Sequence, residues 1–288
     1  MTPADSRSRA TPRVSVMGRI HAAVRQPGLL IARAALLLIV AWAVFPDWFT
    51  SYDPIRTDIS ATLLPPSGQH WFGTDELGRD VLSRVIHGTG LSLRTTVTAV
   101  AIALLVGSCI GLVSGFTGGR TDAILMRAVD VLLAFPLLLL SMAMVTVLGF
   151  GATQLSVAVG VALVGSLARV MRAETLKVRK AVYVDAALSI GTRPFTVLIR
   201  HVLPNAKGPV LALAVLELGQ AVLAIAALSF LGFGAPPPSP EWGALVSAGQ
   251  RYLGAAWWMS ILPGLVIATT VVAVSRVARA IQDREANA

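Results

Sequence analysis

T-T-V-T-A-V-A-I-A-L-L-V-G-S-C-I-G-L-V-S-G-F, residues 95 to 116, contains no charged side chain and decides what kind of protein this is. Roughly 20 apolar residues in a helix are enough to cross the hydrocarbon core of a bilayer. Residues 255–275 form a second uncharged stretch of the same kind. The composition agrees, because 55% of the residues are hydrophobic and only 14% are charged, whereas about a quarter are charged in a soluble domain. The sequence therefore predicts an integral membrane protein.

Three more apolar segments, one of them long enough for two spans, bring the number of predicted spans to six. Residues 131–168 are long enough for two spans, with Gly149–Thr153 as a tight turn between them. Residues 210–231 hold a single charge, Glu217. The weakest candidate is 29–49, which carries a basic residue whose side chain can snorkel to the membrane surface. The expected fold class is all-α, a polytopic membrane protein with six transmembrane helices.

The basic residues orient these spans. With the N-terminus assigned to the cytoplasm, 19 of the 24 Lys and Arg residues lie in inside segments and five lie in outside segments. This bias follows the positive-inside rule, so both termini are expected in the cytoplasm. Membrane orientation thus accounts for the net charge of +9, and nucleic-acid binding is not expected, since no basic helix carries interleaved aromatic residues.

The expected organisation has five parts: an inside tail at 1–28, a first span at 29–49, an outside loop with an amphipathic helix at 50–90, a five-helix core at 91–275 that includes an inside loop at 172–208, and an inside tail at 276–288. A cleaved signal peptide ending near Ala41-Trp42-Ala43 is the competing interpretation of the first span. The long basic region before it and the Trp at the cleavage position favour an uncleaved signal-anchor helix.

The outside loop contains W-F-G-T-D-E-L-G-R-D-V-L-S-R-V-I-H-G, residues 71 to 88. Thr74 is a suitable N-cap, with acidic residues in the first turn and apolar residues on one face at helical spacing. One interpretation is an amphipathic helix on the outer membrane surface. The other is a docking surface for an external partner. Its candidate residues are Thr74, Asp75, Gly78, Arg79 and Asp80.

Catalytic and cofactor-binding motifs are absent from the sequence. It has no G-x-x-x-x-G-K-[ST] loop for nucleotide phosphates, no His spacing typical of a metal site and no nucleophile motif. Glu217 is the main intramembrane ionisable residue, and it either lines a transport pathway or is satisfied by a neighbouring Ser or by Gln220. The chain is therefore expected to be a non-enzymatic membrane subunit without a bound cofactor or metal: a passive channel, or a part driven by a partner.

The inside segment Y-V-D-A-A-L-S-I-G-T-R-P-F-T-V-L-I-R-H-V-L-P-N, residues 183 to 205, favours the driven subunit. The positions of its Gly and Pro residues predict a short helix at 180–190 that ends at Gly191, and a second helix at 195–202 that Pro204 terminates. Two short helices tied to neighbouring spans make a rigid lever. Within it, Ala186 and Ala187 leave a smooth surface, and Tyr183 and Asp185 offer polar contacts at its edge.

At these residues the chain resembles the permeases of ABC importers. D-A-A-x-x-x-G, residues 185 to 191, is similar to the "EAA" loop of that family, and R-H-V-L-P-N, 200 to 205, is similar to its dipeptide/oligopeptide/nickel branch. G-T-D-E-L-G-R-D-V-L-S-R (73–84), L-S-F-L-G-F-G (228–234) and P-x-P-E-W-G (238–243) agree. The resemblance covers about residues 30–275 and is to the second, "C-type" permease subunit. Departures are Asp185 in place of Glu and Ile225 where the branch often has an acidic residue.

The resemblance implies the fold of a type I ABC importer transmembrane domain in a bacterial inner membrane. The inside segment would be the coupling helix, which sits in a cleft of a cytoplasmic ATPase. By this resemblance the candidate ATPase-coupling residues are Tyr183, Asp185, Ala186, Ala187, Gly191, Leu203 and Pro204. Implied partners are a B-type sister permease, one or two ATPases that bind ATP and Mg, an external substrate-binding protein and membrane lipid. The implied cargo is di- or oligopeptides, with a nickel chelate, haem or another small solute as the alternative. The rival of a different class is a stand-alone channel or secondary carrier.

Overall fold

The computed structural model describes residues 27–286, and over that range the chain consists of helices and their connecting loops. One isolated β-bridge joins Thr74 to Asp80, and two short 3-10 turns lie at Pro46–Trp48 and Ile59–Ala61. The helices are α2 Pro27–Val44, α3 Val81–Thr117, α4 Gly119–Ala134, α5 Leu137–Leu148, α6 Ala152–Arg179, α7 Val182–Ser189, α8 Pro194–Val197, α9 Leu203–Phe230, α10 Trp242–Gln250 and α11 Trp258–Ala286.

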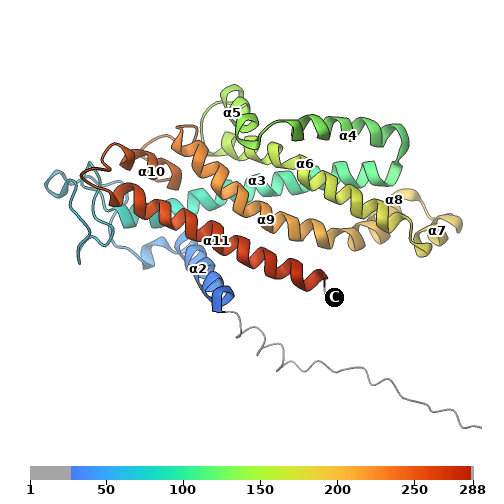
Figure 1. Cartoon of the computed structure of the whole chain (residues 1–288), viewed down its shortest axis with the longest axis horizontal. Coiled ribbons are helices and arrows are strands. Elements are labelled where there is room, and N and C mark those ends of the chain that lie inside the picture. Colours follow the sequence, from blue (N-terminus) through green and yellow to red (C-terminus); the bar gives the residue numbers. More distant parts are fainter. Residues whose placement is uncertain (1–26, 287–288) are drawn as a thin grey trace, which may run out of the picture.

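The long helices form an elongated bundle (Figure 1). α3, α6, α9 and α11 run along its length, α2 packs on α11 and α3, and α4 and α5 pack on α6. Helices α7 and α8 lie at one end, and the loops of residues 45–80 lie with α10 at the opposite end. Following the charge distribution, we call the α7–α8 end the inner end and the opposite end the outer end.

The predicted all-α fold class is confirmed, and the predicted third span needs a correction. Five helices are long and apolar enough to cross a membrane, and the count reaches six when α4 and α5 are taken as one span bent by 96°. The uncharged stretch that begins at residue 131 is therefore not one straight helix. The residue before a proline is disfavoured in the helical conformation, so α4 ends at Ala134 and a new helix starts after Pro136.

The outer amphipathic helix that was expected to start at Thr74 does not form. Gly73 and Gly78 have φ values of +70° and +73°, which a right-handed helix does not allow. The chain instead makes a tight loop, and helix α3 begins only at Val81, capped by Asp80, whose carboxylate accepts a hydrogen bond from the Ser83 N–H at 2.6 Å. From there α3 is one continuous 37-residue helix. Its first turns are buried in the protein and do not lie on the membrane surface.

A second element of the outer end was missed by sequence reasoning. The loop after α9 contains a short helix, α10, over Trp242–Gln250. Trp258, which precedes the apolar part of α11, is only 5% exposed. Its indole N–H donates a hydrogen bond of 3.1 Å to the Thr74 carbonyl. Trp258 is therefore a core residue of the outer end, whereas Trp257 is half exposed.

Helices α3 and α6 approach each other closely because α3 carries a glycine every fourth residue. A Cβ at Gly107 would lie 2.9 Å from the Val164 carbonyl oxygen, and one at Gly115 would lie 2.9 Å from the Arg172 carbonyl oxygen. Gly111, between them, faces Ala168 in the same way. Stripes of small residues at this spacing let membrane helices pack backbone to backbone. This Gly-x-x-x-Gly-x-x-x-Gly stripe was readable in the sequence and was overlooked.

The orientation of the chain is still a prediction, and cysteine labelling tests it. Gly68 lies in the outer loops with nothing within 4 Å of an added Cβ, and Lys207 is exposed near the inner end. In a background without the native Cys109, Gly68→Cys should react with an impermeant thiol reagent added outside intact cells. Lys207→Cys should react only after the cells are opened. The reverse pattern would invert the assigned topology.

Candidate functional site

The inner segment, α7 to the start of α9, is anchored firmly to the helical bundle. Val184 of α7, Val197 of α8 and Val202 are each fully buried in the main hydrophobic core. Burial of such side chains contributes about 1.5–3 kcal/mol each relative to exposure. The segment is therefore fixed to α6 and α9.

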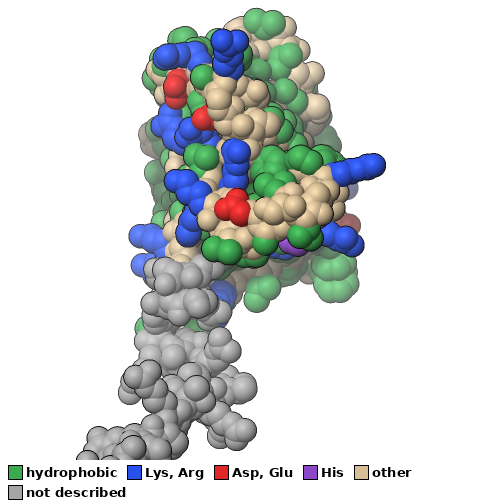
Figure 2. Space-filling model, turned by 90° about the vertical axis from the view of Figure 1, so that its right-hand side faces the viewer, with side chains coloured by type: hydrophobic (Ala, Val, Ile, Leu, Met, Phe, Trp, Pro, Cys, Tyr) green, Lys and Arg blue, Asp and Glu red, His purple; other side chains and the backbone are tan. Residues whose placement is uncertain are grey.

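The opposite face of the same segment exposes large apolar side chains. Val182, Ile190 and Phe195 are 84%, 83% and 74% exposed, and Tyr183 is half exposed. Figure 2, which views the molecule from this end, shows hydrophobic side chains surrounded by Lys and Arg. A cluster of exposed apolar residues with a charged rim is typical of a protein–protein interface. We call Val182, Tyr183, Ile190 and Phe195 the inner apolar face.

The residues of the D-A-A-x-x-x-G motif lie beside the inner apolar face. Asp185 and Ala186 are exposed, and Ala187 is partly buried against the core. Helix α7 ends as predicted, at a glycine: the Gly191 N–H bonds to the Leu188 carbonyl at 3.0 Å, the Thr192 N–H bonds to the Ala187 carbonyl at 3.1 Å, and Gly191 has φ +85°. This is a Schellman motif, in which glycine supplies the left-handed residue.

The second predicted helix of the segment differs from expectation, because Pro204 does not end it. Helix α8 passes into a π-helical turn at Leu198–Val202, and α9 follows without a break. Proline lacks an N–H donor and is tolerated in the first turn of a helix; Leu203 and Pro204 stand at the start of α9, where Leu203 is partly buried and Pro204 is exposed. The inner segment therefore continues directly into α9, a candidate membrane span.

Glu217 lies on α9 and is 4% exposed. Ser166 on α6 donates a hydrogen bond of 2.6 Å to its Oε1, while Oε2 is buried without a hydrogen-bond partner. One prediction was that a neighbouring Ser would satisfy the Glu217 carboxylate. Ser166 does so for one of its two oxygens. A role for Glu217 in a transport pathway stays a prediction.

The five residues expected to form an external docking surface are buried, which corrects that expectation. Thr74, Asp75, Arg79 and Asp80 are 0–9% exposed, and Gly78 is also buried. The Asp75 carboxylate accepts hydrogen bonds from the backbone of Leu77 and Arg79 and from the Arg79 guanidinium. These residues hold the outer loop in its fold and present no surface to a partner. Over residues 27–286, no three His, Cys, Asp or Glu residues are grouped so that they could hold a metal ion.

Glu241 of the P-x-P-E-W-G motif is a structural residue that the sequence reasoning did not single out. It is 1% exposed, and its carboxylate accepts hydrogen bonds from the Ser229 hydroxyl at 2.6 Å and the Ala235 N–H at 2.8 Å. It thereby ties the loop after α9 to the end of α9. A pocket of about 510 Å³ opens beside this loop. Its lining residues come from the outer loop, the α5–α6 turn, the end of α9 and α10.

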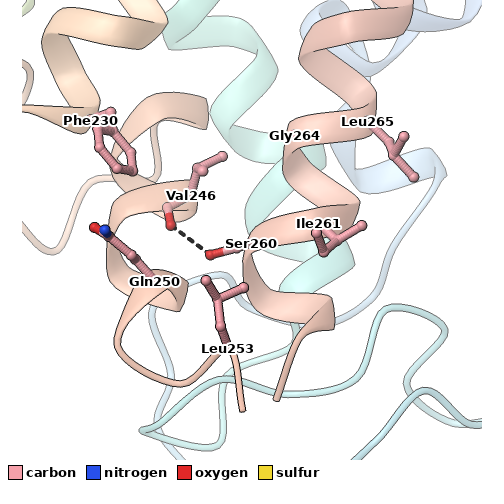
Figure 3. A pocket seen from close by; sticks show the side chains of 8 residues that line it. All are labelled: Phe230, Val246, Gln250, Leu253, Ser260, Ile261, Gly264 and Leu265. Carbon is pink, nitrogen blue, oxygen red and sulfur yellow. Dashed lines mark hydrogen bonds between the residues drawn. The ribbon is translucent and has the colours of Figure 1, made fainter. Parts of the chain in front are cut away.

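An apolar groove runs between α9, α10 and α11. Two adjoining pockets of about 470 and 460 Å³ share Phe230, Val246 and Gly264. Figure 3 shows the first of them, in which the Ser260 hydroxyl donates a hydrogen bond of 2.8 Å to the Val246 carbonyl. That bond satisfies the hydroxyl, so the groove is suited to apolar contacts.

The geometry agrees with comparisons to known proteins. Residues 107–287 match the family described as "Binding-protein-dependent transport system inner membrane component". The chain is 38% identical to the probable D,D-dipeptide transport system permease protein DdpC of Escherichia coli (strain K12), over 89% of this chain and 86% of that protein. It is 39% identical to the di/tripeptide transport system permease protein DppC of Pseudomonas aeruginosa (strain UCBPP-PA14), over 86% and 84%. It is 35% identical to the glutathione transport system permease protein GsiD of Pectobacterium atrosepticum, over 90% and 87%.

Solved structures agree at the level of the fold. The inward-facing MetNI methionine ABC transporter matches with a TM-score of 0.53 and 17% identity, over 69% of this chain and 96% of that chain. An amino acid ABC transporter matches with a TM-score of 0.54 and 18% identity, over 70% and 94%. The chain therefore belongs to the binding-protein-dependent transport system inner membrane component family, and it is a multi-pass permease subunit of an ABC importer in the inner membrane.

Proposed function

We propose that this chain forms one half of a heterodimeric translocation pore for di- and oligopeptides. The other half is a sister permease, an external binding protein delivers the peptide, and cytoplasmic ATPases bind ATP and Mg. The chain itself performs no covalent chemistry. Nucleotide binding shifts the population between inward- and outward-facing states, and the inner segment transmits that shift to the spans.

The inner apolar face carries this proposal. Val184, Val197 and Val202 fix the segment to the bundle, while Ile190 and Phe195 remain more than 70% exposed on its far side. Exposed apolar surface of this kind costs solubility unless a partner covers it. Because the segment leads directly into α9, a movement of the covering partner is passed to a membrane helix. A stand-alone channel would leave this face without a use.

The names of the relatives support a peptide cargo. Those relatives are assigned to D,D-dipeptides, di- and tripeptides, and glutathione, which are all small peptides. A nickel chelate or haem appears in none of these three names. We therefore favour peptides over the other solutes of the branch.

A matched pair of Ile→Glu variants tests the docking of the ATPases. Ile190 on the inner apolar face and Ile59 in the outer loop are 83% and 89% exposed, so neither change disturbs the core of the chain. Burying an Ile at an interface contributes about 1.5–3 kcal/mol, and a buried carboxylate adds a further cost. When tagged permease is purified from cells that express all subunits, Ile190→Glu should recover roughly tenfold less ATPase than the unaltered chain.

Ile59→Glu should recover unaltered amounts of ATPase, and both variants should retain the sister permease. Equal ATPase recovery with Ile190→Glu would show that the inner apolar face is not the docking site. Purification of the unaltered chain alone, without ATPase or sister permease, would favour the stand-alone channel.

A further inference from the structure

The pocket beside the Glu241 loop carries two opposite charges on its walls. It has a volume of about 510 Å³ and is lined by Glu76 of the outer loop and Arg251 at the end of α10, with Phe150 on another wall. Pockets of 300–1,000 Å³ are the usual size for small-molecule ligands. The pocket lies at the outer end, where a solute enters an importer.

Glu76 has an oxygen that lacks a donor. Its Oε1 is 3.4 Å from the Arg79 Nη2, a long and weak contact, while Oε2 is buried without a hydrogen-bond partner. An unpaired buried carboxylate oxygen is costly, and the Glu76 side chain, which is 26% exposed, lines the pocket. A ligand ammonium group bound at this carboxylate would supply the donor that it lacks.

Arg251 provides the complementary charge. It is exposed, and within the described residues no carboxylate lies within 4 Å of it. A free guanidinium binds carboxylates in a bidentate manner. The Ser247 and Tyr252 side chains line the same pocket and offer further hydroxyl groups. Phe150 is largely exposed and stacks on Phe233 with ring centroids 5.6 Å apart, which gives the pocket an aromatic wall for an apolar side chain.

We propose that this pocket is a solute-entry site that binds the free amino terminus of a small peptide at Glu76 and its free carboxylate at Arg251. This inference rests on the proposed function and adds a recognition site within this subunit. It also separates the candidate solutes by charge. A haem carries carboxylates but no ammonium group and would leave Glu76 unpaired, whereas a zwitterionic peptide pairs with both walls.

Binding to the whole transporter without its binding protein tests the proposal. The purified complex in nanodiscs is titrated with Ala-Ala, N-acetyl-Ala-Ala and Ala-Ala amide, and binding is followed by saturation-transfer NMR. For the unaltered complex, each capped peptide should bind about tenfold or more weakly than Ala-Ala, because it lacks one charge-assisted hydrogen-bonding group.

Two variants should each remove one half of this preference. Glu76→Gln should bind Ala-Ala and N-acetyl-Ala-Ala alike but still reject Ala-Ala amide. Arg251→Gln should bind Ala-Ala and Ala-Ala amide alike but still reject the acetylated peptide. The controls are Asp47→Asn and Arg56→Gln, exposed charges of the outer end outside this pocket. Both controls should keep the full preference.

The inference is overturned if the unaltered complex binds none of the three peptides, binds all three equally, or keeps its preferences in both variants. Uptake of Ala-Ala with the binding protein present is measured in parallel. Peptide uptake without these preferences would refute the entry site and leave the proposed function standing, and uptake of no peptide would refute the proposed function as well. A third outcome also overturns the inference. The Glu76→Gln and Arg251→Gln variants could keep the peptide preferences but no longer respond to the ligand-free binding protein with faster ATP hydrolysis. The pocket would then be a docking site for the binding protein.

Discussion

Replacing Gly111 with valine should abolish the folded permease, and even Gly111→Ala should destabilise it measurably. A Cβ at this position would lie 2.7 Å from the Met171 Cβ and 2.8 Å from the Arg172 backbone nitrogen, and it would also press on the Ala168 carbonyl. Backbone atoms cannot rotate out of the way, so α3 and α6 would have to separate. Their interface is the most extensive between any two helices of the described chain.

The cost of Gly111→Ala should be about 1–3 kcal/mol, as for other overpacked cores, and the two additional methyl groups of valine should raise it further. Native proteins are stable by only about 5–15 kcal/mol. The yield of monodisperse protein in size-exclusion chromatography and its thermal unfolding midpoint measure the effect.

Gly90→Ala is the matched control on the same helix. A Cβ there would lie 3.4 Å from the Ala43 carbonyl oxygen, which is an ordinary contact. Alanine is favoured over glycine inside a helix by about 0.5–1 kcal/mol, so Gly90→Ala should leave stability unchanged or slightly raised. If Gly111→Ala behaved like Gly90→Ala, the close approach of α3 and α6 would not be a determinant of stability.

Gly191→Val should reduce peptide uptake and substrate-stimulated ATP hydrolysis at least tenfold while leaving membrane insertion intact. Space is not the obstacle, because nothing lies within 4 Å of an added Cβ. The obstacle is the backbone, since φ is +85° and a β-branched residue is strained there by roughly 1–3 kcal/mol. The Schellman turn would open, and α7 would no longer hold the inner apolar face in place.

Gly254→Val is the control for this variant. Gly254 also has nothing within 4 Å of an added Cβ, but its φ lies outside the left-handed region. Uptake by Gly254→Val should therefore match that of the unaltered protein.

Asp185→Ala should act differently from Gly191→Val, because it removes an exposed carboxylate without straining the chain. If Asp185 makes a charge-assisted hydrogen bond to the ATPase, docking should weaken about tenfold. Wild-type uptake by both Gly191→Val and Asp185→Ala would show that residues 183–205 do not couple ATP hydrolysis to transport.

Local patterns in the sequence were sufficient for the membrane class and for the end of α7 in the inner segment, but not for the end of the helix that follows it. Uncharged runs such as 95–116 identify spans because a helix in lipid satisfies its own backbone hydrogen bonds, whatever its neighbours are. Gly191 was identified as the end of α7 for a similar reason: the requirement for a left-handed residue arises within the turn itself. Pro136 carried the local signal for the bend between α4 and α5, and that signal was missed.

The outer end was decided by contacts between residues far apart in the chain. The sequence pattern predicted an exposed helix start at Thr74, Asp75 and Arg79. In the structure their polar groups are instead satisfied within the folded loop. Trp258, 184 residues further along the chain, packs against Thr74. Glu241 is held by nearer residues, because Ser229 and Ala235, 12 and six residues away, donate hydrogen bonds to its carboxylate. The sequence by itself determined which segments enter the membrane and where the inner lever turns, because those depend on transfer energies and backbone conformations of neighbouring residues. Only the tertiary structure decided which polar side chains are buried and which line a pocket, because burial depends on what packs against a residue from elsewhere in the chain.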